Sequence, residues 1–146
     1  MRRTALRSAV SGLAAMFACV PAAAVTCAIT PQGVNFGSYG PLNPQPLDSA
    51  GNISVQCDGE TTFTLSLDRG AGSYSARQMS SGANVLEYNL YTDPSRVIVW
   101  GDGSAGTDTV SATATAAEKP IYGRITPRQN VPVGSYADVI TVTLTY

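Results

Sequence analysis

The stretch Asp138-Val139-Ile140-Thr141-Val142-Thr143-Leu144-Thr145-Tyr146 decides the fold, because from Ile140 onward apolar residues alternate with threonines. A period of two is typical of a β-strand that buries one of its faces. Ile140, Val142, Leu144 and Tyr146 share one face, and the three threonines share the other. We therefore expect a strand over residues 138–146 whose apolar face belongs to a core.

The same alternation recurs upstream in short segments that are separated by turn residues. Further strands are predicted at residues 52–57, 62–68, 86–92, 97–100, 109–115 and 119–125, with a first strand broken into 28–30 and 34–36. Irregular loops are expected at residues 41–46, which hold three prolines, and at 69–82. No long segment keeps the apolar period of a helix. The pattern favours an all-β sandwich of two sheets.

The most hydrophobic predicted strand is also the last one in the sequence. An immunoglobulin-like sandwich normally continues with a further strand, so we expect an incomplete sandwich that lacks its last strand. The open apolar edge would accept a strand from another chain by donor-strand complementation. We expect the acceptor groove to be lined by Leu65, Ile140, Val142, Leu144 and Tyr146. The alternative, a sheet completed by another topology, stays open on the pattern alone.

The N-terminal residues have the layout of a secretory signal peptide. Arg2, Arg3 and Arg7 precede an apolar run at residues 9–20, and Ala22-Ala23-Ala24 supplies a small-residue cleavage site. The run is shorter than the roughly 20 residues that span a bilayer. We therefore expect residues 1–24 to be removed and residues 25–146 to form one exported domain without a membrane span.

Cleavage after Ala24 leaves two cysteines, Cys27 and Cys57. An even number of cysteines in an exported chain predicts a disulfide, because export delivers them to an oxidising compartment. The alternative is a metal site with two thiolates. The sequence contains no histidine to complete such a site, so we expect neither a metal nor a cofactor.

Several functional classes are disfavoured by composition. The net charge is −1 for the whole sequence, and a nucleic-acid binder would need a basic face. Without histidine the usual Ser-His-Asp relay is impossible, and no acid lies in a recognisable catalytic motif. We expect a protein that is not an enzyme and has no catalytic residues.

Three polar or exposed features remain to be interpreted. Trp100-Gly101-Asp102-Gly103 lacks the ligand order of a calcium loop and is interpreted as a glycine-rich turn. The arginines Arg77, Arg96 and Arg124 are expected to be solvated or paired with acids such as Asp93 and Asp102. The proline-rich loop at residues 40–47 carries Leu42 and Leu47, which we regard as possible contacts to an external surface.

Eight motifs in one order carry a resemblance to a known family. They are Val34-Asn35-Phe36-Gly37-Ser38-Tyr39, Asn52-Ile53-Ser54-Val55-Gln56-Cys57, Arg77-Gln78-Met79, Leu86-Glu87-Tyr88-Asn89-Leu90-Tyr91-Thr92-Asp93, Val99-Trp100-Gly101-Asp102-Gly103, Ile121-Tyr122-Gly123-Arg124-Ile125, Gly134-Ser135-Tyr136-Ala137-Asp138 and Thr141-Val142-Thr143-Leu144-Thr145-Tyr146. With them the chain resembles the spore coat protein U domain, which also builds subunits of Csu-type archaic chaperone–usher pili.

The resemblance implies an incomplete immunoglobulin-like sandwich and the Cys27–Cys57 bridge. It implies a periplasmic chaperone that lends a strand, an outer-membrane usher, and other subunits that donate strands. The chain would then join a pilus or coat at the cell surface and support adhesion and biofilm formation. The alternatives are a stand-alone spore or cell coat protein without usher assembly and a secreted carbohydrate-binding module.

One departure from polymerising pilins concerns the residues before the first cysteine. After the expected cleavage only Val25 and Thr26 precede Cys27, whereas a strand typically needs about 5–6 residues. We therefore expect a subunit that accepts a strand without donating one, in a terminal or accessory position.

Overall fold

The computed structural model describes residues 24–146, so the predicted signal peptide lies outside the described residues except for Ala24. The described part consists of β-strands and loops. It contains no helix, and so no helix there could cross a membrane. Its strands are β1 Cys27–Gln32, β2 Leu47–Leu67, β3 Arg77–Ser81, β4 Asn84–Tyr91, β5 Val110–Ile125 and β6 Val142–Thr145. All strand pairs are antiparallel.

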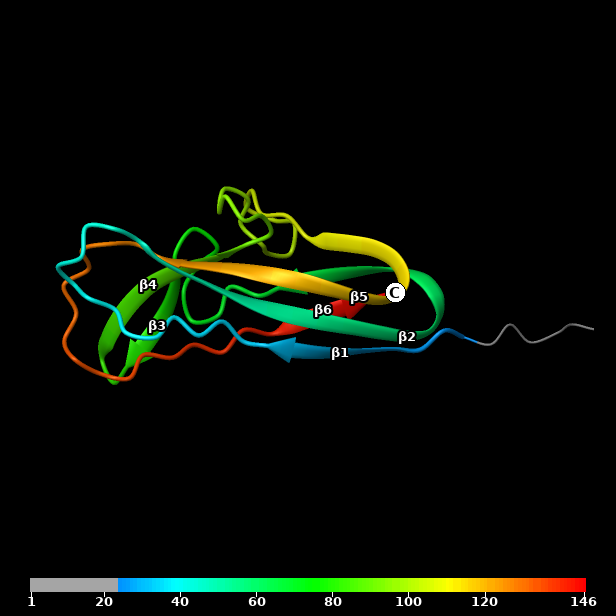
Figure 1. Ribbon diagram of the computed structural model, residues 1–146, viewed down its shortest axis with the longest axis horizontal. Helices are drawn as coiled ribbons and strands as arrows, with labels where there is room; N and C mark the ends of the chain where they lie inside the picture. Colours follow the sequence, from blue (N-terminus) through cyan, green and yellow to red (C-terminus); the bar gives the residue numbers. More distant parts are fainter. Residues whose placement is uncertain (1–23) are drawn as a thin grey trace, which may run out of the picture.

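The long strands β2 and β5 run through both layers of a sandwich. They pair along most of their length, with a register shift between Gln56 and Thr61. Figure 1 shows both ribbons turning back on themselves at one end of the molecule. Residues 47–56 pair with 116–125 in one layer, and residues 61–65 pair with 110–114 in the other. β1, β4 and β3 extend the first layer, and β6 pairs with the second half of β2.

The core lies between the two layers and follows the alternation of the strands. Ile53 and Val55 of the first layer and Phe63, Leu65 and Leu67 of the second are at most 1% exposed. Full burial of each such side chain contributes roughly 1.5–3 kcal/mol. The outer face of the second layer carries hydroxyls instead, and Thr62 and Thr64 of β2 bond to Thr113 and Ser111 of β5.

The predicted strands differ from the observed ones in several places. Apart from Asp68, the segments 52–57 and 62–68 belong to one strand, β2, and apart from Thr109, the segments 109–115 and 119–125 belong to β5. Residues 58–61 lay between two predicted strands, but in the structure β2 continues through them with a register shift in its pairing to β5. Residues 34–36 are not a strand, and Val99 and Trp100 form only isolated bridges.

Two further predictions were wrong. The segment 69–82 was expected to be a loop but contains β3. The last strand was expected over residues 138–146, but β6 covers only Val142–Thr145. The ladder between β6 and β2 ends at Val142, because the side chain of Asp68 takes part in the next hydrogen bonds. The backbone N–H of Asp68 donates to Thr141 O, and its carboxylate accepts from Thr141 N.

The disulfide predicted between Cys27 and Cys57 is confirmed. The two residues are direct register partners of β1 and β2, and their Cα atoms lie 4.1 Å apart. They are 30 positions apart in the sequence. Closing a loop of this length stabilises a protein by roughly 3–4 kcal/mol in the chain-entropy model. The bond therefore holds the start of β1 beside β2.

Arg77 lies in the core with no exposed surface, so the expectation of a solvated or acid-paired side chain was wrong. Its guanidinium donates to the carbonyls of Asp68 and Trp100, both at 2.7 Å, and to the side-chain oxygen of Asn89 at 2.6 Å. Burial lowers the pKa of this guanidinium. Because its partners come from the residue that follows β2, from β4 and from the Trp100 turn, Arg77 links three segments.

The other two arginines pair with an acid that the sequence did not single out. Arg124 Nε lies 2.7 Å from the Asp48 carboxylate, and Arg96 lies 3.4 Å from it. The Arg124 guanidinium lowers the pKa of Asp48. The Asp93 and Asp102 carboxylates instead accept hydrogen bonds from nearby backbone N–H groups.

Replacing both disulfide cysteines, Cys27→Ser with Cys57→Ser, should lower the free energy of unfolding by roughly 3–4 kcal/mol. Urea denaturation of the purified variant and of the purified protein with both cysteines present and oxidised measures this change. An unchanged denaturation midpoint would contradict the stabilising role of the bond.

Arg77→Met should lower the free energy of unfolding by about 2 kcal/mol or more. It removes the donors to the buried Trp100 carbonyl and the partly buried Asp68 carbonyl, and a buried group left without a partner costs about 1–3 kcal/mol. The matched control is Arg69→Met, because Arg69 is exposed. Equal urea midpoints for the two variants would show that the buried network contributes nothing.

Candidate functional site

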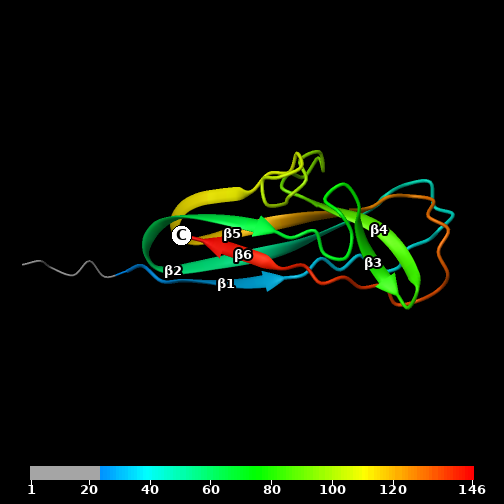
Figure 2. The same cartoon turned by 180° about the vertical axis from the view of Figure 1, so that it is seen from behind.

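Two strand edges are free on the same side of the sandwich. Among the described strands, both β1 and β6 pair only with β2. They extend different halves of β2 and so belong to different layers. Figures 1 and 2 show β6 beside β1 and running in the opposite direction. The outer edges of both strands therefore offer main-chain donors and acceptors that no strand in the described residues takes up.

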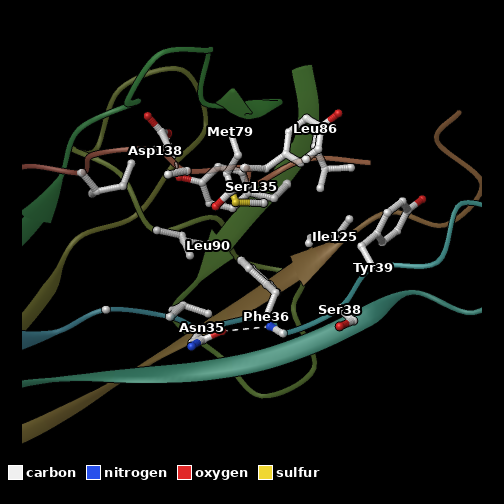
Figure 3. Close-up of a pocket in the computed structure, with 18 of the residues that line it drawn as sticks. Asn35, Phe36, Ser38, Tyr39, Met79, Leu86, Leu90, Ile125, Ser135 and Asp138 are labelled. Carbon is white, nitrogen blue, oxygen red and sulfur yellow. Dashed lines mark hydrogen bonds between the residues drawn. The ribbon is translucent and has the colours of Figure 1, made fainter. Parts of the chain in front are cut away.

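A groove of about 1060 Å³ lies on this side of the molecule. Its first wall is formed by residues 31–41, which include the end of β1 and the segment after it, and its second wall by residues 131–142, which lead into β6. The floor is apolar and consists of Leu67, Met79, Leu86, Tyr88, Leu90, Ile121 and Ile125. Figure 3 shows Phe36 of the first wall and Ser135 of the second on opposite sides of Leu90 and Ile125.

The walls are only half-buried, although their inward side chains are apolar. The floor residues Leu90 and Ile125 are 4% and 1% exposed. By contrast Val34, Phe36, Tyr39, Val131, Tyr136, Ile140 and Val142 all keep part of their surface accessible while packing against the core. The core is thus covered by two layers but open along the groove.

The first wall depends on a glycine in β5. A Cβ on Gly123 would lie 2.7 Å from the Phe36 ring and 2.8 Å from the Val34 side chain, so only glycine lets this segment cross β5 so closely. The Phe36 ring then packs edge-on against Tyr88, with centroids 5.8 Å apart. The Asn35 side chain accepts a hydrogen bond from Gly37 N, drawn in Figure 3.

The second wall is held by a small set of polar contacts. Ala137 exchanges two backbone hydrogen bonds with Ser80 of β3, at 2.9 and 3.1 Å. The Tyr88 hydroxyl donates to Asp138 Oδ2 at 2.7 Å. Burial, together with this bond, raises the pKa of Tyr88. These contacts fix residues 137 and 138 in the second wall.

The structure brings two of the five predicted groove residues into the lining. Ile140 and Val142 line the second wall. Leu144 is half-buried against the core, and Leu65, its register partner in β2, is fully buried. Tyr146 lies beyond the end of β6 and is 54% exposed.

The two leucines predicted as surface contacts have different environments. Leu42 is 94% exposed, whereas Leu47 begins β2 and packs against the core. Of these two leucines, Leu42 is therefore the one that an external partner could contact.

The Trp100 turn is held by its own hydrogen bonds. The Asp102 carboxylate accepts from the hydroxyl and the backbone N–H of Ser104, and the hydroxyl bond lowers the pKa of Asp102. Within residues 24–146 no three His, Cys, Asp or Glu side chains gather in a way that could hold a metal ion.

The fold and groove define a class of protein, the incomplete immunoglobulin-like sandwich, and the predicted fold class is confirmed. The chain belongs to the Spore Coat Protein U domain family, whose model matches residues 13–143. Protein U of Myxococcus xanthus is 33% identical over 127 residues, which cover 77% of this chain and 71% of that protein.

A solved structure with the same fold is a pilus protein. It is the chaperone–tip adhesion subunit pre-assembly complex CsuC–CsuE from the archaic chaperone–usher Csu pili of Acinetobacter baumannii, with a TM-score of 0.60 and 24% identity. The match covers 84% of this chain but only 40% of the solved chain. The likeness supports the fold.

Gly123→Ala should displace Val34 and Phe36 from β5 and lower the free energy of unfolding by about 1–3 kcal/mol, the usual effect of overpacking. The control is Gly40→Ala, because the nearest atom to a Cβ there is 3.9 Å away. Thermal melting of both variants measures the difference. A Gly123→Ala melting temperature equal to that of the control would contradict the close crossing.

Proposed function

We propose that this protein is an exported structural subunit of a bacterial surface pilus or coat, completed by a strand from another chain. The observation that carries the proposal is the apolar groove between the segment that follows β1 and the segment that leads into β6, with a buried floor and half-buried walls, next to the free edges of these two strands. Extended peptides bind such edges through main-chain hydrogen bonds, and alternate side chains enter the groove. A structural role agrees with a family named for a coat protein.

The apolar contribution of such a strand is large. A strand of about six residues directs about three side chains inward, because successive side chains point to opposite faces. Full burial of three apolar side chains contributes on the order of 5–9 kcal/mol before the cost of ordering the strand. Without that cover, the open edge favours aggregation.

The proposed partners follow from the need to cover the groove during export. The solved CsuE subunit is held by its chaperone CsuC. We propose that a periplasmic chaperone supplies the first strand here and that an outer-membrane usher passes the subunit to the surface, where another subunit replaces that strand. The assembled protein would support adhesion and biofilm formation, with exposed Leu42 as a contact.

The position in the fibre depends on signal-peptide cleavage. Cleavage after Ala24 would leave Val25 and Thr26 before Cys27, too few residues to serve as a donor strand. We therefore propose a terminal or accessory subunit. N-terminal sequencing of the exported protein tests this, since cleavage well upstream of Ala24 would leave room for a donor strand.

A second candidate function is a coat protein that assembles without an usher. The observation that favours it is the match to a family named for a spore coat protein, together with the 33% identity with Protein U. Chaperone and usher genes beside this gene would favour the pilus, and their absence would favour the coat.

Periplasmic expression with and without the cognate chaperone tests the strand-accepting function. We expect soluble protein only as a chaperone complex. Ile140→Asn in the groove wall should reduce co-purification with the chaperone. The matched control, Val139→Asn, should not, because Val139 is the adjacent residue and is 83% exposed. A stable monomer that melts cooperatively without the chaperone would overturn the proposal.

A further inference from the structure

The groove contains one formal charge. Among the residues that line it, Asp138 is the only acid, and none is a lysine or arginine. Asp138 lies on the second wall, and Figure 3 shows it across the groove from Asn35 and Phe36. It is half-buried. A strand that fills the groove would therefore remove water from a carboxylate in otherwise uncharged surroundings.

The position of the carboxylate is built into the fold. Its Oδ1 accepts from Ala71 N at 3.2 Å and Val139 N at 2.9 Å, and its Oδ2 accepts from the Tyr88 hydroxyl at 2.7 Å. Gly70 leaves the space that Oδ2 occupies, because a Cβ there would collide with this oxygen. The carboxylate is thus held in one orientation by neighbours from three segments.

These contacts do not use all the hydrogen-bond acceptor sites of the Asp138 carboxylate. Its two oxygens offer about four acceptor sites, and the three contacts leave one site on Oδ2. The nearby cation Arg77 does not fill it, because its guanidinium donates to Asp68 O, Trp100 O and Asn89. Covering the remaining acceptor with an apolar strand is unfavourable, since a buried charge needs a hydrogen-bonding partner.

We infer that the strand accepted by this groove carries one cationic side chain, lysine or arginine, at the inward position that faces Asp138, among otherwise apolar inward residues. The inference rests on the proposed function and specifies the partner of the same groove. A charge-assisted hydrogen bond to Oδ2 would occupy the remaining acceptor site of the Asp138 carboxylate. It would also fix the register, because a slip of one residue turns every inward side chain outward.

The test uses the exported protein purified with its chaperone and synthetic peptides of about twelve residues with leucine at alternate positions. Lysine replaces leucine at each inward position in turn, and glutamate replaces it in a matched series. Displacement of the chaperone gives the relative affinity. We expect lysine to weaken binding at every inward position except one, where it should bind about tenfold or more better than glutamate.

Asp138→Asn should abolish that single preference, measured as the ratio of lysine-peptide to glutamate-peptide affinity at that position. The control is Asp108→Asn, because Asp108 is exposed and outside the groove. A merely structural role of Asp138 would weaken all peptides alike. Tyr88→Phe provides a second test that keeps the carboxylate. It removes one donor from Oδ2 and should increase the preference for lysine.

The outcomes separate the two proposals. If the all-leucine peptide binds but lysine is unfavourable at every inward position, the inference is overturned and strand acceptance stands. If Asp138→Asn leaves a lysine preference intact, the inference is also overturned. If no peptide displaces the chaperone and the free chain is a stable monomer, the proposed function itself fails.

Discussion

The pairing of β2 with β5 is the constraint on which the rest of the structure depends. Because both strands bend at the same register shift, a single pair supplies the central strands of two layers. The first layer is then extended on both sides, by β1 and by β4 with β3, whereas the second gains only β6. The groove is the direct consequence, since β1 and β6 attach to different halves of β2 and no described strand lies between them.

Local patterns in the sequence predicted the strand segments but not their continuity. The alternation around Ile53 and Phe63 was clear, yet Asp58-Gly59-Glu60 resembles an ordinary turn. The strand continues across it because pairing with β5 stops at Gln56 and resumes at Thr61, a long-range feature that the local pattern does not contain. Strand β3 escaped prediction because it begins with Arg77, a charged residue that is rarely buried. Its burial depends on carbonyl groups from distant segments, which a local pattern cannot reveal. The disulfide was predictable because the count of cysteines left few choices.

The two walls of the groove were predictable to different degrees. Ile140 and Val142 followed from strict alternation, whereas Leu65 and Leu144 pair with each other farther along β6. The first wall showed only as a broken strand, because its placement depends on Gly123 in a remote part of the chain. A glycine between Ile121 and Ile125 in a strand was the available signal, since such a glycine often marks a close approach of another segment. The role of Asp138 needs the positions of Tyr88 and Ala71, which no sequence pattern contains.

The disulfide has a consequence for the timing of assembly. It joins the first residue of β1 to its register partner in β2, so this edge of the sandwich is anchored whether or not the groove is filled. The entropic cost of ordering β1 is then largely incurred during folding. Less of this cost is left when an incoming strand binds. An oxidised chain presents a preorganised edge, whereas a reduced chain would have to order β1 and the incoming strand together. In the proposed assembly, oxidation of the two cysteines would therefore come before the incoming strand binds.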